Sequence, residues 1–194
     1  IFLQLLSYTA TVTNTFVKKI NSFSKKSQPC LVFDTRKTLP GLRLAQKYAV
    51  TVGGGNNQRL GLWDGVLFKE NHLNCLDGIG GLIKKLEMLK NTDFKEFLNK
   101  KKIQVEVESF HEFELALSTG FKNILLDNFT DEQIRKAVKK NNNRAILEVS
   151  GGLDKKNLKF LSNSGVNRIS IGRLTKNVEA VDFTLLITNN KESK

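Results

Sequence analysis

The sequence has few cysteines and no long apolar run, and each shortage excludes a class of protein. Its two cysteines, Cys30 and Cys75, stand in different contexts and lack the spacing of metal ligands, so we expect neither a disulfide framework nor a zinc site. No apolar run approaches the ~20 residues that a membrane span requires. These shortages predict a reduced, cytoplasmic setting and no membrane partner.

Acidic residues are also scarce, because 19 Asp and Glu stand against 31 Lys and Arg, which gives a net charge of +12. A surplus of this size suits nucleic acid, an anionic membrane surface or anionic small molecules. Nucleic acid is disfavoured because the 13 Phe residues fall mostly on apolar faces and do not interleave with basic residues. We therefore expect no nucleic-acid partner, and basic runs such as 139–143 are typical of solvated helix ends and loops.

The length and composition predict one globular domain. A chain of 194 residues with 40% hydrophobic content can bury one sizeable core but not two large ones. We place the domain at 1–188, with a first helix over 1–22, a terminal strand over 181–188 and a disordered tail at 189–194.

Short apolar segments alternate with helical patterns along the rest of the chain. Helices of this length between strands imply parallel pairing through right-handed crossovers. The predicted fold class is therefore α/β, a parallel α/β barrel of about six strands that is closed or nearly closed. The predicted strands are 31–33, 66–68, 103–107, 124–126, 145–149 and 168–171, and the predicted helices between them are 41–50, 79–98, 111–118, 131–139 and 155–162.

Polar residues follow each predicted strand at its carboxyl end. The active site of a parallel barrel lies at that end, so we expect these side chains to meet at one mouth. Basic residues between 31 and 73 also stand on backbone broken by glycine and proline, including the triple glycine at 53–55, which predicts a pocket for phosphate and carboxylate groups. The strand-end residues are Asp34, Arg36, Lys37, Lys69, Glu106, Glu108, Asp127, Asn128, Ser150, Gly151, Gly152 and Gly172.

The types of these residues suit an anionic sugar phosphate. Glu106 and Asp127 can hold Mg²⁺ or accept hydrogen bonds from sugar hydroxyls, and the glycines at 151–152 and 172 expose backbone amides to phosphate. Each residue taken alone has a structural alternative, such as a surface ion pair or a pair inside the barrel. The side chains that can hold carboxylates and phosphates are Arg36, Lys37, Arg59 and Lys69.

Several motifs in this order resemble the quinolinate phosphoribosyltransferase family, also called nicotinate-nucleotide pyrophosphorylase (carboxylating). The resemblance covers essentially the whole chain, and its first motif is long enough to be specific. It implies transfer of a phosphoribosyl group from phosphoribosyl pyrophosphate to quinolinate with loss of CO₂, giving nicotinate mononucleotide in NAD synthesis. The motifs are DTRKTLPGLR at 34–43, GGGNNQR at 53–59, KENH at 69–72, VEVE at 105–108, LDNF at 126–129, LEVSGG at 147–152 and ISIGRLT at 169–175.

The resemblance also implies roles for individual residues. Quinolinate carboxylates would be held by Arg36, Arg59 and Lys69, and the phosphates of the second substrate by Lys37. Glu106 and Asp127 would meet the ribose hydroxyls and Mg²⁺. The residues implied to cradle phosphate are Ser150, Gly151, Gly152 and Gly172, and those implied to be catalytic are Lys37, Lys69, Glu106 and Asp127.

Three positions depart from the family pattern. Gln58 and Lys176 stand where the family usually has histidine, and Arg173 stands where it usually has a small residue. Gln58 can still donate a hydrogen bond to a carboxylate, and Lys176 keeps a cation for phosphate. We therefore include Gln58 and Lys176 among the substrate-binding residues.

The family has an N-terminal α/β sandwich domain that is absent from these residues. In the family it covers the barrel of the other subunit, which implies a homodimer with shared active sites. Because the chain starts without Met inside a helical pattern, we expect a piece of a longer protein whose isolated barrel leaves apolar surface bare and is inactive alone.

Two other enzyme classes fit part of the pattern. A sister phosphoribosyltransferase could act on nicotinate, or the chain could match the barrel protein associated with molybdate transport. A lysine-dependent aldolase would use Lys69 as a Schiff base, although holding an anion is the commoner use of such a lysine. The four basic residues favour a dicarboxylate substrate.

Overall fold

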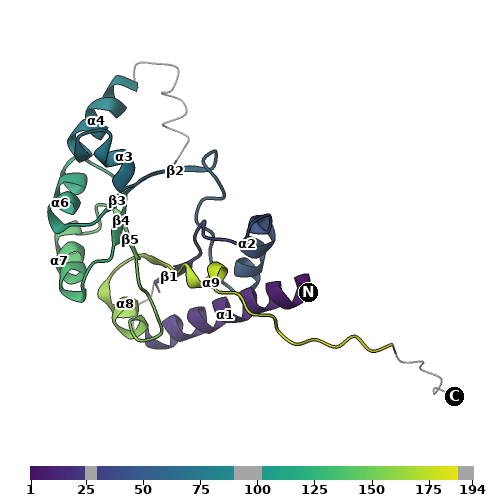
Figure 1. Ribbon diagram of the computed structural model, residues 1–194. Helices are drawn as coiled ribbons and strands as arrows, with labels where there is room; N and C mark the ends of the chain where they lie inside the picture. The colour runs from purple at the N-terminus through teal and green to yellow at the C-terminus, as the bar shows by residue number, and fades with distance from the viewer. Residues whose placement is uncertain (25–29, 90–101, 188–194) are drawn as a thin grey trace.

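The computed structural model describes residues 1–24, 30–89 and 102–187 (Figure 1). Six parallel strands form one curved sheet in the order β1-β6-β5-β4-β3-β2. This arrangement confirms the predicted parallel α/β class. The strands are β1 (Leu31–Phe33), β2 (Gly65–Phe68), β3 (Lys102–Val107), β4 (Asn123–Asp127), β5 (Ile146–Ser150) and β6 (Arg168–Ser170).

Helices surround the sheet on its outer side (Figure 1). Those between successive strands match the predicted helices closely, while the short α3 and α9 were not predicted. The predicted helix over 79–98 ends at Leu89 within the described residues, and 90–98 lie outside them. The helices are α1 (Phe2–Phe23), α2 (Arg43–Val52), α3 (Glu70–Asn74), α4 (Gly78–Leu89), α6 (Phe110–Ser118), α7 (Asp131–Asn141), α8 (Leu158–Ser164) and α9 (Arg173–Lys176).

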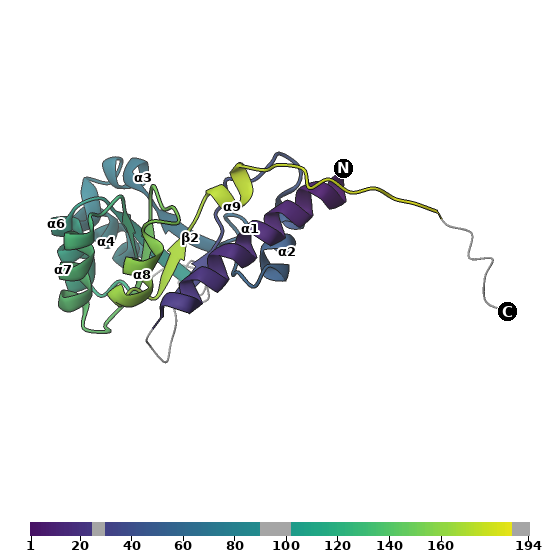
Figure 2. The same cartoon turned by 90° about the horizontal axis from the view of Figure 1, so that it is seen from below.

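Helix α1 extends past the barrel, and the last described segment passes beside its first turns (Figure 2). Val181 N donates to Gln4 O at 3.3 Å, where the last described segment passes the first turns of this helix. The predicted terminal strand over 181–188 is wrong for residues 181–187, which are neither helix nor strand. The proposed tail at 189–194 lies outside the described residues, as does residue 188.

The hydrophobic core lies between the sheet and its helices. Successive side chains of a strand point to opposite faces, and the buried aliphatic residues of the strands alternate with polar ones. The aliphatic side chains that point outward from the sheet pack with helix residues such as Phe113 and Ile134. The side chains that point into the barrel are largely polar. The outward set includes Val32, Val105, Val107, Ile124, Leu126, Leu147, Val149 and Ile169, and the buried polar set of the strands includes Gln104, Glu106, Glu148 and Ser170.

The barrel is nearly closed. Within the described residues β1 and β2 are the two edges of the sheet and do not pair with each other. The segment after α2 lies beside β1, because Asn56 N donates to Val32 O at 2.8 Å and Asp34 N donates to Asn56 O at 3.0 Å. This short pairing covers the edge of β1 and leads the chain toward β2.

The triple glycine at 53–55 serves helix packing. A Cβ on Gly53 would lie 2.7 Å from Thr13 Cβ and closer still to Ala10 O, and a Cβ on Gly55 would lie 2.7 Å from Thr13 Cγ2. Only glycine lets this backbone approach α1 so closely. The structure therefore gives these glycines a packing role against α1, and the residues that line a cavity, Asn57 to Arg59, follow them.

Capping residues fix where two of the outer helices begin. Thr130 accepts a hydrogen bond from Gln133 N, and the Gln133 side chain accepts one from Thr130 N, so the two residues form a capping box. Ser109 and Glu112 form a second box at the start of α6. Both helices therefore begin directly after the strand ends that carry the candidate site.

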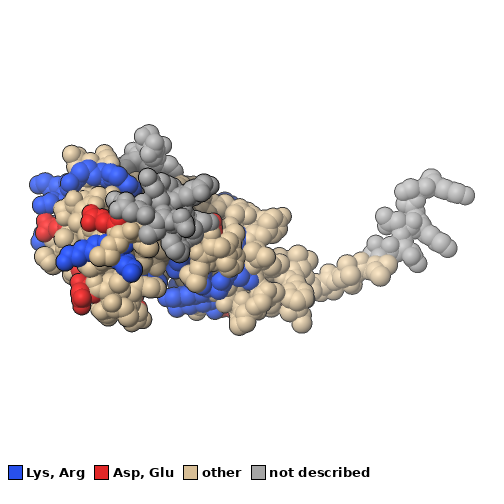
Figure 3. Space-filling view, turned by 90° about the horizontal axis from the view of Figure 1, so that it is seen from above, with Lys and Arg blue, Asp and Glu red and all other residues tan. Residues whose placement is uncertain are grey.

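The surface charge is divided into groups. On the face that Figure 3 shows, Lys and Arg side chains lie in several separate groups with acidic side chains between them. In the part of the chain that the structure describes, no helix has both the length and the apolar composition needed to cross a membrane.

Candidate active site

A cavity of about 500 Å³ opens at the carboxyl ends of the strands. Its lining comes from the loops after β1, β4, β5 and β6, which are distant in sequence. The barrel therefore brings most of the predicted phosphate-binding residues to one mouth. The predicted residues among its lining are Lys37, Asp127, Asn128, Ser150, Gly151, Gly152, Gly172 and Lys176, together with Thr35 and Arg173.

Backbone geometry explains the glycines at this mouth. Gly151 has φ +92°, and a Cβ there would lie 2.8 Å from Asn128 N. Gly172 has ordinary φ, but a Cβ there would lie 3.7 Å from Lys37 Cδ and 3.8 Å from Thr35 Oγ1. The loop after β6 thus leaves open space among the cations, which suits a bound phosphate.

Lys69 and Glu106 form an ion pair at the ends of β2 and β3. Lys69 Nζ lies 2.6 Å from Glu106 Oε2 and 2.8 Å from Oε1, and the two side chains are 43% and 6% exposed. Burial raises the pKa of Glu106, and the negative charges of Asp127 and Glu70 raise it further, while Lys69 opposes the rise. Lys69 therefore holds a buried carboxylate and still reaches solvent.

Arg36 and Arg59 lie near each other and near Glu106. Burial lowers the pKa of Arg59, the charge of Arg36 lowers it further, and the charge of Glu106 raises it. Arg59 Nη1 donates to Gly65 O at 3.1 Å. Within the described residues, the buried Nε atoms of both arginines lack hydrogen-bond partners. Buried guanidinium donors without partners are suited to bind an anion with more than one carboxylate.

Gln58 points into the barrel rather than toward the mouth. Its Nε2 donates to Glu148 Oε1, and lies 3.4 Å from Ser170 Oγ. Glu148 is fully buried and also accepts from Ser170 Oγ and, at 2.8 Å, from Gln104 Nε2. Arg168 Nε lies 2.6 Å from Glu148 Oε2, which pairs the buried charge. The amide nitrogen of Gln58 is thus engaged inside the barrel.

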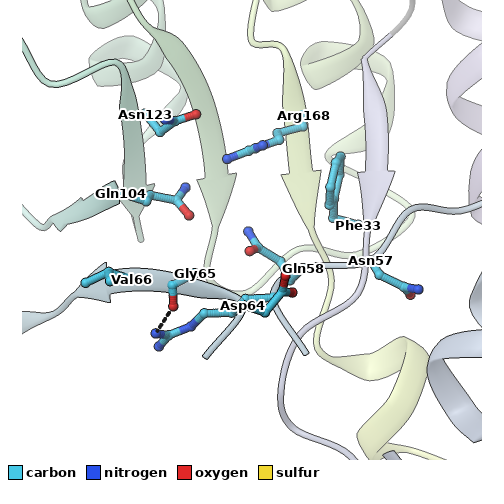
Figure 4. A pocket seen from close by; sticks show the side chains of 10 residues that line it. Phe33, Asn57, Gln58, Asp64, Gly65, Val66, Gln104, Asn123 and Arg168 are labelled. Carbon is cyan, nitrogen blue, oxygen red and sulfur yellow. Dashed lines mark hydrogen bonds between the residues drawn. The ribbon is translucent and has the colours of Figure 1, made fainter. Parts of the chain in front are cut away.

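A second cavity of about 410 Å³ lies next to this network (Figure 4). Arg168 and Gln104 point into it from the sheet, and Gln58 faces them from the segment that covers the edge of β1 (Figure 4). Arg59 also lines it and donates to Gly65 O. Arg168 packs over the Phe33 ring, 5.1 Å from its centroid.

Hydrogen bonds from the side chains of Arg43 and Thr175 hold the backbone of the loop after β1. Arg43 donates to Thr38 Oγ1, Arg36 O and Leu60 O at 3.2, 3.3 and 3.4 Å. Thr175 Oγ1 donates to Lys37 O at 2.7 Å, which joins this loop to α9. These contacts fix the backbone that carries Arg36 and Lys37.

Sequence patterns missed several of these residues. Asp34 was expected at the mouth, but it is fully buried and pairs with Lys47 at 2.6 Å. Glu148, Arg168 and Gln104 were not singled out, although a charged residue in the middle of an apolar strand indicates a polar interior.

Carboxylates that can hold a metal ion gather around Glu106. Glu70, Glu106 and Glu108 each offer an oxygen, and these oxygens lie within 4.8 Å of one another. Asp127, the second predicted ligand, affects the pKa of Glu106 electrostatically. These oxygen donors are of the type that Mg²⁺ prefers.

The chain is similar to proteins of known name. A nicotinate-nucleotide pyrophosphorylase structure from Francisella tularensis has a TM-score of 0.80 and 41% identity, over 92% of this chain and 59% of that one. A probable nicotinate-nucleotide pyrophosphorylase [carboxylating] from Methanocaldococcus jannaschii is 40% identical over 94% of this chain and 63% of its own length. One from Bacillus subtilis is 35% identical over 98% of this chain and 62% of its own.

These relatives are longer than the chain, which spans about three fifths of their length. A profile described as "Quinolinate phosphoribosyl transferase, C-terminal domain" matches residues 9–186. The chain therefore belongs to the quinolinate phosphoribosyltransferase family and contains its C-terminal domain.

Proposed function

We propose that the protein containing this chain transfers a phosphoribosyl group from phosphoribosyl pyrophosphate to quinolinate, with loss of CO₂, to form nicotinate mononucleotide. The observation that carries the proposal is the Lys69–Glu106 ion pair together with Arg59, whose guanidinium is subject to the charges of both Arg36 and Glu106. The names of the relatives agree with it.

The two arginines and Lys69 suit the two carboxylates of quinolinate. Each guanidinium can form a bidentate pair with a carboxylate, and the half-exposed Lys69 supplies a third positive charge. Holding the pyridine in this way turns a bimolecular reaction into one between fixed groups. The ring nitrogen can then attack the anomeric carbon of the ribose while pyrophosphate departs.

The mouth cavity suits the second substrate. Lys37, Arg173 and Lys176 line it together with the glycines after β5 and β6. Positive charge there neutralises the leaving pyrophosphate as negative charge develops on it. Glu106 and Asp127 can accept hydrogen bonds from the ribose hydroxyls and stabilise the positive charge that forms at the anomeric carbon.

Glu106 and Asp127 are also the residues that we propose to hold Mg²⁺, which when bound would neutralise the pyrophosphate. Glu70 and Glu108 offer further oxygens nearby. After transfer, the positive charge on the ring nitrogen stabilises the electron pair that stays on the adjacent ring carbon when its carboxylate leaves as CO₂, and this carbon then takes a proton from solvent. Arg36 and Arg59 then keep hold of the remaining carboxylate.

We also propose a cytoplasmic homodimer in which a second subunit completes each site. Apolar side chains exposed at the start of α1 and in residues 185–187 support it, because a larger assembly would cover them. Light scattering of the purified protein gives its mass in solution, and a monomeric active enzyme would contradict the dimer.

Chromatography of the reaction products tests the proposed function. Incubation with quinolinate, phosphoribosyl pyrophosphate and Mg²⁺ should yield nicotinate mononucleotide, and nicotinate in place of quinolinate should yield far less. Equal product from nicotinate would favour the sister enzyme that acts on a monocarboxylate.

A further inference from the structure

A buried ion pair lies behind the site and plays no part in the chemistry described above. Lys47 Nζ is 2.6 Å from Asp34 Oδ1, and the side chains are 1% and 0% exposed. Asp34 follows β1, and Lys47 stands in the middle of α2. Removing two charges from water costs more than burying a matched apolar pair, so stability alone does not account for it. The pair is therefore a candidate for a positioning role.

Both charged groups hold the backbone of the segment that covers the edge of β1. Lys47 Nζ donates to Gln58 O at 2.8 Å, and Gln58 N donates to Asp34 Oδ1 at 2.7 Å. The Asn57 amide, in the orientation that satisfies both of its polar groups, donates to Asp34 Oδ2 at 2.8 Å. Both backbone polar groups of Gln58 are thus bound to one rigid pair of charges.

The next residue is Arg59, whose guanidinium is subject to the positive charge of Arg36. Two like charges repel, and among the described residues the side chain of Arg59 has one hydrogen bond, to Gly65 O. A long side chain in such a place keeps its direction only if its backbone is fixed. The hydrogen bonds to both backbone polar groups of Gln58 fix the backbone directly before Arg59.

We propose that Asp34 and Lys47 form a clamp that positions Arg59 and thereby sets the preference for a substrate with two carboxylates. The inference rests on the proposed function, because it assigns Arg59 to quinolinate. Neither Asp34 nor Lys47 lines the phosphate cavity, which the clamp touches through Thr35, the residue after Asp34. Loss of the clamp therefore weakens quinolinate binding and leaves phosphoribosyl pyrophosphate binding unchanged.

The test is calorimetry on the double variant Asp34→Asn/Lys47→Met of the full protein. It removes both charges together, so neither is left buried alone. We expect the Kd of quinolinate to rise about tenfold or more and the Kd of phosphoribosyl pyrophosphate to stay within about twofold. The matched control is Glu132→Gln/Lys136→Met, which removes an exposed ion pair of α7 and should change neither Kd.

A purely structural role predicts a different result. The melting temperature would fall while the two Kd values stayed unchanged or rose in proportion, and either outcome would overturn the clamp. If the double variant does not fold, Asn57→Ala tests the same contact more gently. It should weaken quinolinate binding alone, and no change would count against the clamp. Failure of the unchanged protein to bind quinolinate would overturn the proposed function instead, and the clamp with it.

Discussion

Lys69 Nζ lies within hydrogen-bond distance of both carboxylate oxygens of Glu106, 2.8 Å from Oε1 and 2.6 Å from Oε2. The acid is buried and the lysine is half exposed. A bound dicarboxylate would therefore meet a cation whose position is already fixed by a neighbouring strand. Preorganised charge of this kind costs no rearrangement when the reaction occurs.

The Lys69→Met substitution should abolish most of the activity. It removes the cation from the substrate and leaves Glu106 buried without its partner, so we expect kcat/KM for quinolinate to fall by about two orders of magnitude or more. Steady-state kinetics measures the loss. The control Lys84→Met changes an exposed lysine of α4, and activity near that of the unchanged enzyme in Lys69→Met would exclude the assigned role.

The acid limb of the pH profile should follow Glu106. Burial raises its pKa above the ordinary value of 4.5, so activity that needs the carboxylate is lost as the pH falls through this raised pKa. The free energy of unfolding depends on the protonation of Glu106 in the opposite direction. The contribution of Glu106 to folding is fully present below its unfolded pKa and is lost as the pH rises through the folded one.

Glu70→Gln should move that acid limb to lower pH. The negative charge of Glu70 is one of the causes that raise the pKa of Glu106, and its removal lowers that pKa. Glu87→Gln, which changes an exposed residue of α4, is the control. If kcat/KM has the same dependence on pH in the unchanged protein, in Glu70→Gln and in Glu87→Gln, Glu106 does not govern the acid limb of the profile.

Arg36→Lys should raise KM for quinolinate more than it lowers kcat. Lysine keeps the charge but cannot form the bidentate pair with a carboxylate, and the loss of one such bond is worth about 1.5–3 kcal/mol. Arg135→Lys is a suitable control, because Arg135 packs over the Phe160 ring on the outer surface, 4.7 Å from its centroid. An unchanged KM in Arg36→Lys would place the carboxylates elsewhere.

Gly172→Leu should weaken phosphoribosyl pyrophosphate binding and spare quinolinate binding. A leucine side chain would fill the space between Thr35 and Lys37, whereas the single methyl group of Gly172→Ala makes only ordinary contacts at 3.7 Å and beyond. Titration calorimetry of both variants separates the two effects. Equal affinity for phosphoribosyl pyrophosphate in the two variants would mean that phosphate does not occupy this space.

Gly53→Ala should destabilise the fold. The added methyl group would overlap α1, 2.7 Å from Thr13 Cβ, and overpacking of this kind typically costs about 1–3 kcal/mol. Gly80→Ala in α4 meets nothing within 4 Å and should stabilise the helix by about 0.5–1 kcal/mol. Thermal unfolding of the two variants should show Tm changes of opposite sign, and a neutral Gly53→Ala would contradict the packing role.

The strand positions and their common mouth could be predicted from sequence because parallel strands deliver their carboxyl ends to one side. Strand β1 was predicted at its observed bounds, and residues after β1, β4, β5 and β6 line one cavity as expected. The predicted strand over 181–188 is wrong for residues 181–187, because an apolar run does not by itself provide a neighbouring strand to pair with. Residues 181–187 have no neighbouring strand among the described residues.

Contacts between distant segments could not be predicted. The close approach of Gly53 to α1 has the same local pattern as a phosphate loop, so the sequence does not distinguish the two. The roles of Asp34 and Gln58 depend on Lys47 and Glu148, which lie 13 and 90 residues away along the chain. Asp34 and Gln58 meet these partners only because all four side chains are brought together inside the assembled barrel, and the local sequence does not show this.

The most direct test of the central claim is a calorimetric titration of the protein with quinolinate and, separately, with nicotinate. If Arg36, Arg59 and Lys69 form one site for two carboxylates, quinolinate should bind at least about tenfold more tightly than nicotinate. Equal affinities, or no binding of quinolinate, would contradict the account.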